Sequence, residues 1–444
     1  MRFFEKKLSL FLLLFSLPLL FLPKLNLISF DSETAGLRID DFVLFFFGAL
    51  LIWSHAILHK TLYKIEVWML LLTAFAILSF LSNRFFVSLG VLHLDAKIFY
   101  TVRLLEYFLF FYIGALASQF ALGKPLMQAF FIWSFLLMTL QKLNLAGAVT
   151  VTGYSTDVST RVQGIASFPS EMGLLLNLLF CYLIFDNSYQ SKFVRLFASP
   201  LARYFLRKCY PYLLFALFGL FVIFTGNRIS IIALIVCFFG RLKDEFNWRS
   251  MGSILTISLL TPLLLGGIIL VITQTDSVYQ RSAGLLSMKN FELAKVVWDK
   301  IDMTKNPVGN EVVAADEYDM SWWMRIHKWI YVIKVYVSHP EIYLQGLGPG
   351  FAWSALDGGL LRILTEYGLI GAFLFWKFFQ SLYRINPQIK WMMVAFAINM
   401  IFFDAYLAYK TMSFLFFAAG YAFESKHRPP LSTSCSAKIA INPA

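Results

Sequence analysis

The chain has 444 residues, of which 59% are hydrophobic and only 14% are charged, and its mean hydropathy is +0.68. This balance excludes a soluble globular domain as the basis of the whole chain and indicates that lipid is its solvent. We attribute the formal charge of +12 to membrane topology rather than to nucleic-acid binding, because Lys and Arg beside apolar spans gather on the cytoplasmic side.

The N-terminal segment carries Arg2, Lys6 and Lys7 ahead of the apolar run 8–22. A secretory signal peptide begins in the same way, but residues 21–24 (Phe-Leu-Pro-Lys) offer no small-residue cleavage site. The pattern therefore predicts an uncleaved first helix.

Apolar runs recur along the chain, and about 20 apolar residues in helical form cross a bilayer core of about 30 Å. Twelve candidate spans follow, at 8–22, 42–58, 67–82, 98–122, 125–140, 171–185, 211–225, 229–240, 253–273, 358–376, 391–403 and 404–423. With the N-terminus inside, the cytoplasmic connections carry several-fold more Lys and Arg than the short outer ones, which favours twelve spans with both termini inside. Because Asp404 and Lys410 interrupt the last pair, an arrangement of eleven spans stays open.

Four regions follow from this topology. Residues 1–273 hold nine spans, 274–357 form a large periplasmic loop, 358–423 hold the last three spans, and 424–444 are a disordered cytoplasmic tail. Within the loop, residues 285–301 and 318–338 have helical spacing of apolar residues. The four cysteines suggest neither a disulfide nor a metal site.

Two arginines are predicted to lie at the outer surface between spans. The sequence Thr225-Gly226-Asn227-Arg228 reads as a tight outer turn, and we favour a ligand-binding role for Arg228 over a simple snorkelling residue. Arg161 begins the approach to a helix start at Pro169. That segment is either an ordinary loop or the source of a second guanidinium for an anionic ligand.

The long loop offers Arg325, which fits either a ligand contact or the polar face of an interfacial helix. The glycines at 346, 348 and 350 form a plain turn or an anion cradle, of which the turn is preferred. Asp357 stands where the loop re-enters the membrane. Its carboxyl group is either a base with a raised pKa or an ordinary cap of the helix that follows.

Two pairs of opposite charge have helical spacing. Arg362 and Glu366 are four residues apart, and Arg103 and Glu106 are three apart, so each pair is expected to form an ion pair within one helix. Gly368 and the neighbouring Gly371 are expected to allow close helix packing.

Together these landmarks resemble the O-antigen polymerase and ligase superfamily of bacterial lipid-linked glycan glycosyltransferases, the Wzy-type polymerases in particular. The similarity covers roughly residues 161–371, and the first five spans match in hydropathy only. The matching pieces are Arg161 with Gly164 and Pro169, the turn at Arg228, the stretch from Arg325 through Trp329 to His339-Pro340, the glycines of 346–350, and 366–371 (Glu-Tyr-Gly-Leu-Ile-Gly).

The resemblance implies an all-α polytopic, GT-C-like protein of the bacterial inner membrane. It would transfer a glycan from undecaprenyl diphosphate to an acceptor hydroxyl on the periplasmic face, without metal or other cofactor. It would thereby polymerise repeat units into O-antigen or exopolysaccharide. Its partners would be the lipid-linked glycan and the bilayer, together with a chain-length regulator and a flippase, with no nucleic acid.

The residues expected to act on this substrate follow from the same likeness. Catalytic roles fall to Asp357, Arg228 and Arg325, since fixed guanidinium groups stabilise charge that grows on a departing diphosphate. Substrate binding falls to Arg228 and Arg325 again, together with the further residues Arg161, Arg281, Gly348 and Gly350. His339 and His327 are alternative bases, although His339-Pro340 also reads as a helix stop.

Two alternatives to a polymerase remain. Superfamily members that ligate glycan to lipid A core usually have histidine where this chain has Asp357, which tilts the assignment away from an O-antigen ligase. A flippase or other transporter of lipid-linked glycan would need charges across the whole bilayer, whereas the candidate charges crowd the outer rim.

Overall fold

The computed structural model describes most of the chain, namely residues 2–22, 26–30, 35–59, 62–148, 160–186, 188–191, 200–245, 261–262, 266, 288–305, 312–313, 318, 320–352 and 355–427. In this part the regular structure is helical except for one hairpin, in which β1 (Asn26–Phe30) pairs antiparallel with β2 (Ala35–Arg38). The fold is therefore helical, as the composition predicts. The hairpin was not expected, and it connects the first two helices.

The helices come in chain order as α1 (Arg2–Phe21), α2 (Ile39–His59), α3 (Lys64–Ser88), α4 (Ile98–Gln119), α5 (Gly123–Lys142), α6 (Pro169–Ile184), α8 (Pro200–Thr225), α9 (Arg228–Glu245), α12 (Met288–Lys300), α13 (Met320–Ser338), α14 (Gly359–Tyr383), α15 (Pro387–Asn399) and α16 (Tyr409–His427). Two short 3-10 turns, η1 (Pro340–Ile342) and η2 (Ala405–Leu407), follow α13 and α15.

Five helices among the described residues are long and apolar enough to cross a membrane, at Lys64–Ser88, Ile98–Gln119, Gly123–Lys142, Leu206–Thr225 and Gly359–Tyr383. The outer face of α3 shows why lipid is the solvent, because Leu71, Leu78 and Phe85 on it are largely exposed. Such a surface of large apolar side chains is unfavourable in water and favourable against acyl chains. These helices support a membrane protein.

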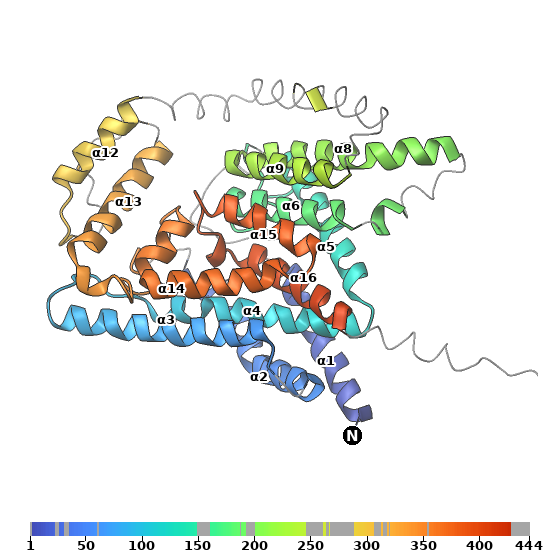
Figure 1. Ribbon diagram of the computed structural model, residues 1–444, viewed down its shortest axis with the longest axis horizontal. Coiled ribbons are helices and arrows are strands. Elements are labelled where there is room, and N and C mark those ends of the chain that lie inside the picture. Colours follow the sequence, from blue (N-terminus) through green and yellow to red (C-terminus); the bar gives the residue numbers. More distant parts are fainter. Residues whose placement is uncertain are drawn as a thin grey trace, which may run out of the picture.

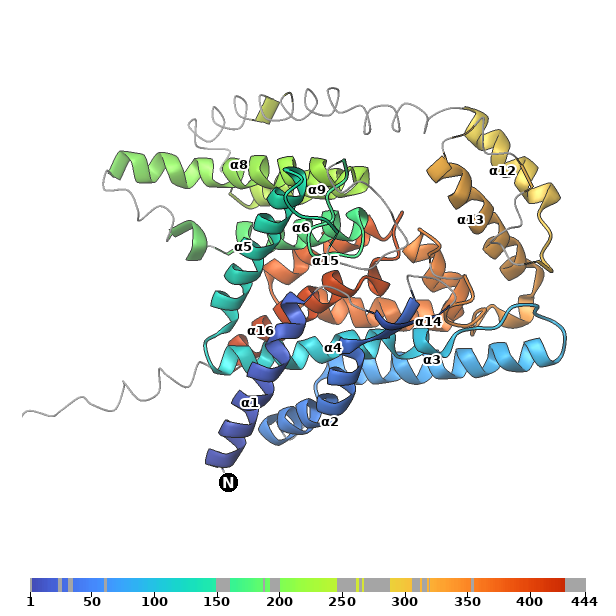
Figure 2. The same ribbon diagram turned by 180° about the vertical axis from the view of Figure 1, so that it is seen from behind.

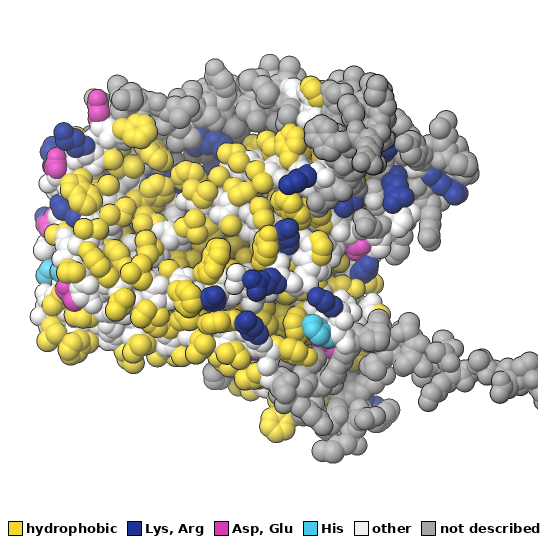
Figure 3. Space-filling model, viewed as in Figure 1, with side chains coloured by type: hydrophobic (Ala, Val, Ile, Leu, Met, Phe, Trp, Pro, Cys, Tyr) yellow, Lys and Arg dark blue, Asp and Glu magenta, His cyan; other side chains and the backbone are white. Residues whose placement is uncertain are grey.

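Most of the helices lie side by side in one bundle, with α12 and α13 as a separate pair at one end (Figures 1 and 2). We call this end, where α6, α9 and α14 begin and α8 and α15 finish, the loop end. The first residues of α1 and the last of α16 lie toward the opposite end. Figure 3 shows a broad apolar face, with some Lys and Arg at its left edge and a larger group over its lower middle and right part.

The centre of the bundle is the contact between α4 and α16. Phe108 and Phe111 of α4 pack with Phe416 and other rings of a large buried cluster. Gly420 lets the two backbones approach, since a methyl group there would meet the carbonyl of Phe111. Small residues at such crossings are typical of helices packed in membranes.

The helix pair in the long loop was predicted, and the structure confirms it. The expected helices 285–301 and 318–338 appear as α12 and α13. They share a small apolar core of their own, in which Leu293 and Val297 pack with Tyr331 and Val335. This pair covers the loop end of the bundle (Figure 1).

Some predicted spans differ from the observed helices. Helix α8 begins at Pro200 rather than Pro211, so Pro211 lies inside the helix. Helix α15 has 13 residues, and at about 1.5 Å per residue it is too short to cross a bilayer core of about 30 Å alone. The predicted span 253–273 falls almost entirely outside the described residues. Arg281 also lies outside them.

Candidate functional site

Arg161 lies against the turn that joins α8 to α9. Its Nε donates a hydrogen bond to the carbonyl oxygen of Thr225 at 3.3 Å, and the amide of Val162 donates to the carbonyl of Phe224. Gly226 has a φ of +64° and directly faces the Arg161 side chain. Glycine adopts this left-handed conformation without strain, so the turn can lie close against the Arg161 side chain.

A polar side chain from α5 fixes the loop that carries Arg161. The amide oxygen of Gln141 accepts hydrogen bonds from the backbone amides of Gln163 and Gly164, at 3.2 and 2.7 Å. Gly164 has a φ of +58° and leaves no room for a side chain beside Met172. The predicted Arg-x-x-Gly loop is thus a rigid element, and the helix start at Pro169 is confirmed.

Arg228 is the first residue of α9, directly after the tight turn that the sequence predicted. The side chain of Asn227 donates to the carbonyl of Ser170 and to the hydroxyl of Ser230, and Ser230 donates to Asn399 at the end of α15. The beginnings of α6 and α9 and the end of α15 are therefore tied together. A helix N-terminus is electropositive, and here it adds to the half-buried Arg228.

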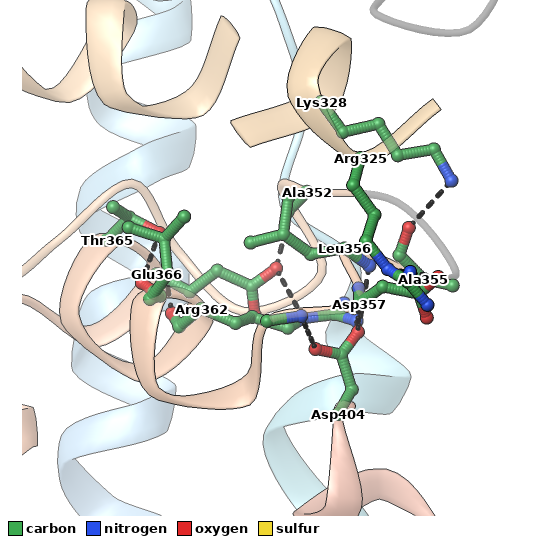
Figure 4. A network of polar contacts seen from close by, with 12 residues as sticks. Arg325, Lys328, Ala352, Ala355, Leu356, Asp357, Arg362, Thr365, Glu366 and Asp404 are labelled. Carbon is green, nitrogen blue, oxygen red and sulfur yellow. Dashed lines mark hydrogen bonds and ion pairs between the residues drawn. The ribbon is translucent and has the colours of Figure 1, made fainter. Parts of the chain in front are cut away.

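A second charged group lies at the entrance to α14. The guanidinium Nε of Arg325, from α13, is 3.5 Å from a carboxylate oxygen of Asp357, and their side chains are 19% and 37% exposed. Lys328, one turn further along α13, donates to the carbonyl of Ala355 at 2.8 Å. Figure 4 shows Arg325 and Lys328 reaching the same short segment. The structure therefore places Arg325 beside Asp357.

The protonation of this group is shifted by its surroundings. Burial raises the pKa of the Asp357 carboxyl above its ordinary 3.8, and the nearby Asp404 acts in the same direction while Arg325 opposes it. Burial also lowers the pKa of the Lys328 ammonium, which Asp357 opposes. A partly desolvated carboxylate held beside a cation is a reasonable proton acceptor.

Asp357 does not cap the helix that follows it, so the interpretation of this residue as an ordinary helix cap is wrong. Helix α14 starts at Gly359, its N-cap is Gly358, and that cap makes no side-chain hydrogen bond. Asp357 has a φ of +57°, a left-handed conformation that costs most residues other than glycine about 1–2 kcal/mol and that aspartate adopts more readily than most. Contacts with the surrounding structure add to the constraint on the geometry of Asp357.

The source of that constraint is Asp404, in the connection between α15 and α16. Its Oδ2 accepts from the amide of Leu356 at 2.8 Å and more weakly from that of Asp357 at 3.4 Å, and its Oδ1 accepts from the amide of Gly358 at 3.1 Å. Consecutive amides of this kind form a concave anion-binding site. In this protein a carboxylate from another part of the chain fills it (Figure 4).

Arg362 completes a buried network behind Asp357. Its Nη1 donates to Asp404 at 2.8 Å and its Nε donates to Glu366 at 3.0 Å, and no part of its side chain is exposed. The ion pair between Arg362 and Glu366 and that between Arg103 and Glu106 are both confirmed. Because Arg362 is fully enclosed, it supports the site and does not face a substrate.

The glycines at 346, 348 and 350 all have positive φ and are buried. The amides of Leu347 and Gly348 donate to the carbonyls of Thr365 and Glu366, at 2.8 and 2.9 Å. The amide of Gly348 is thus used inside the protein, and the flanks of Gly350 are filled by Tyr100 and Lys97. The preferred interpretation as a turn fits these contacts. The proposed site therefore includes no anion-binding role for Gly348 and Gly350.

The residues just before this glycine turn fill a break in α14. Gly368 has a φ of +63°, which interrupts the helix, and the amides of Leu369 and Ile370 donate to the carbonyls of Tyr343 and Leu344. Gly368 is therefore more than a small packing residue, because its left-handed backbone lets the loop enter the helix and satisfy its freed groups.

The two histidines proposed as alternative bases make contacts of other kinds. His327 is buried within α13, where its Nδ1 is 2.9 Å from the carbonyl of Trp323. His339 follows the end of α13, as a helix stop requires, and pairs with Glu341 at 3.1 Å. Among the described residues no group of three or more His, Cys, Asp or Glu side chains is arranged to hold a metal.

Sequence reasoning missed two members of the site, Asp404 and Lys328. An isolated carboxylate in the apolar stretch 391–423 was a signal for Asp404, because charges at such positions are costly and usually paired. Lys328 gave no comparable signal, since a lysine three residues after Arg325 fits the polar face of any helix.

No protein family model matches the chain, and no curated protein matches it either. The class of protein therefore rests on the chain itself. Its apolar helices support a helical membrane protein, and a network of charged side chains lies at the entrance to α14 (Figure 4).

Proposed function

We propose that the protein is a membrane glycosyltransferase of the polysaccharide polymerase kind, which extends a glycan held on undecaprenyl diphosphate. The observation that carries the proposal is the placement of Asp357 against Arg325 at the entrance to α14. The turn with Arg161 and Arg228 lies at the same end of the bundle. A proton acceptor and several guanidinium groups at one end suit this chemistry better than transport alone.

The reaction would begin at the acceptor hydroxyl, whose proton passes to the carboxylate of Asp357. The hydroxyl oxygen then forms a bond to the anomeric carbon of the donor glycan, and the bond from that carbon to the diphosphate oxygen breaks. The leaving diphosphate gains negative charge as this happens. Arg228, Arg325 and Arg161 would stabilise that charge, with Lys328 as a further cation.

We also propose the topology of twelve spans in the bacterial inner membrane, with both termini in the cytoplasm and the loop end in the periplasm. In it, the short α15 crosses together with the connection 400–408 that leads to α16. Lys377 and Arg384 lie within or directly after the last two turns of α14, Lys390 lies in the first turn of α15, and Lys426 lies in the last turn of α16. These helix ends are remote from α13 (Figure 1). Lys and Arg are enriched on the cytoplasmic side, which supports this orientation. Cysteine labelling from the outside at the exposed Leu344, with Lys426 as the inside control, tests it.

The proposed function is tested on purified protein in proteoliposomes, supplied with lipid-linked repeat units isolated from cells that lack the gene. Wild-type protein is expected to produce a ladder of longer lipid-linked glycans. Arg228→Ala and Arg325→Ala are expected to abolish the ladder at unchanged protein level. Arg84→Ala is the matched control, since Arg84 is 52% exposed and pairs with Asp95 at 2.7 Å on the surface.

The outcomes separate the competing functions. Transfer to lipid A core without chain growth would identify a ligase, and movement of the substrate across the bilayer without a new glycosidic bond would identify a transporter. Normal ladders from both arginine variants would reject the site. Full activity of Arg228→Lys would reject a two-pronged contact with diphosphate, since an ammonium cannot form it.

A further inference from the structure

From the contacts around Asp404, we propose that this residue is a positioning residue: its carboxylate holds the segment 356–358 in the shape that aims Asp357 at Arg325. The inference rests on the proposed function for its catalytic meaning, although the contacts stand by themselves. Asp404 lies 47 residues after Asp357 and reaches it only through the fold.

Both oxygens of the Asp404 carboxylate are used. Oδ2 accepts from the amide of Leu356 and from Arg362, each at 2.8 Å, and Oδ1 accepts from the amide of Gly358 at 3.1 Å. All of these partners are donors. An asparagine presents one oxygen and one NH₂ group. Its oxygen can accept from the donors now bonded to Oδ2 or from the donor bonded to Oδ1, but its NH₂ group then faces the remaining donor or donors and cannot bond to them.

The segment needs such an anchor because Asp357 itself has an unfavourable backbone conformation, with a φ of +57°. Only 6% of Asp404 is exposed, so water does not replace the carboxylate easily. Trp329 adds a second anchor, since its indole nitrogen donates to the carbonyl of Leu356 at 2.9 Å. Without Asp404 the amides of 356–358 lose their acceptor, and we expect the segment to relax away from the left-handed conformation.

Asp404 also contributes charge. Among the described residues, the charged groups with the largest effect on the pKa of Asp357 are Arg325 and Lys328 from α13, Arg362 from α14, and Asp404 itself. Asp404 is the one negative charge among them and raises the pKa of Asp357. Removal of its charge therefore lowers the pKa of Asp357, and the acid limb of the rate profile moves to lower pH.

The test compares Asp404→Asn with Asp404→Glu and with the control Asp186→Asn in full-length protein. Asp186 is a mostly buried carboxylate that pairs with Lys124 toward the opposite end of the bundle. Hydrogen exchange of the amides of 356–358 is measured in detergent, and glycan transfer in proteoliposomes over a range of pH. A displacement of about 1 Å at a reacting group costs about 100-fold in rate, which sets the expected loss of kcat.

In Asp404→Asn we expect faster exchange at 356–358, a loss of about 100-fold in kcat with a smaller change in KM for the donor, and an acid limb at lower pH. Asp404→Glu keeps the charge and is expected to recover part of the rate, while Asp186→Asn changes none of these readouts. A merely unstable variant would lose rate equally at every pH.

Unchanged exchange at 356–358 in Asp404→Asn would overturn the inference, and so would a wild-type rate with an unmoved acid limb. The proposed function fails separately, if wild-type protein transfers no glycan. In that case the exchange measurement alone still decides whether Asp404 holds the segment.

Discussion

Replacement of Arg362 by methionine is expected to destabilise the protein strongly. The guanidinium is fully buried between Glu366 at 3.0 Å and Asp404 at 2.8 Å, whose side chains are 0% and 7% exposed. Removal of one partner from a buried ion pair leaves an uncompensated charge, which costs about 3–5 kcal/mol. Arg362→Met leaves two such carboxylates, so we expect a loss in the upper part of that range.

The free energy of unfolding can be measured by equilibrium titration with SDS in mixed micelles. Arg84→Met is the control, because an ion pair at the surface contributes only about 0–1 kcal/mol. The double variant Arg362→Met with Glu366→Gln should be more stable than the sum of the two single changes predicts, since residues in one network couple by about 0.5–3 kcal/mol.

A free energy of unfolding for Arg362→Met within about 1 kcal/mol of wild type, the usual size of a surface ion pair, would refute this reasoning. It would mean that Glu366 and Asp404 tolerate the loss of the cation. A strictly additive double variant would likewise show that Arg362 and Glu366 do not interact energetically.

Other predictions follow from the same geometry. If Asp357 is the base, only its deprotonated form is active, so transfer should decline as pH falls through a pKa above the ordinary 3.8, and Asp357→Asn should remove this acid limb. An acid limb retained in that variant would assign it to another group. Gly368→Ala places a side chain at a φ of +63° and about 2.5 Å from the amide of Gly346, and should cost more than about 1 kcal/mol of stability by the same SDS titration. A stable, active variant would contradict the described break in α14. Gly420→Leu should separate α4 from α16 and reduce the yield of folded protein on size-exclusion chromatography, whereas the same change at Gly147, which has open space around it, should not.

Local patterns in the sequence were enough to predict the elements that depend on near neighbours. Apolar runs predicted most of the helices, because a lipid-exposed backbone must satisfy its hydrogen bonds internally. Residues three or four apart meet on one helix face, so the pairs at Arg103 and Arg362 were correctly predicted. Pro169 and His339 marked a start and an end for similarly local reasons.

The assembly of the site depends on contacts that form only in the folded chain. Arg161 reaches the carbonyl of Thr225 across 64 residues of chain, and Asp404 reaches Arg362 across 42 and Leu356 across 48. No periodicity encodes these contacts, since they depend on which helices become neighbours. The contacts of Asp404 with the amides of the segment around Asp357 have the same origin, because they join parts of the chain that are distant in sequence.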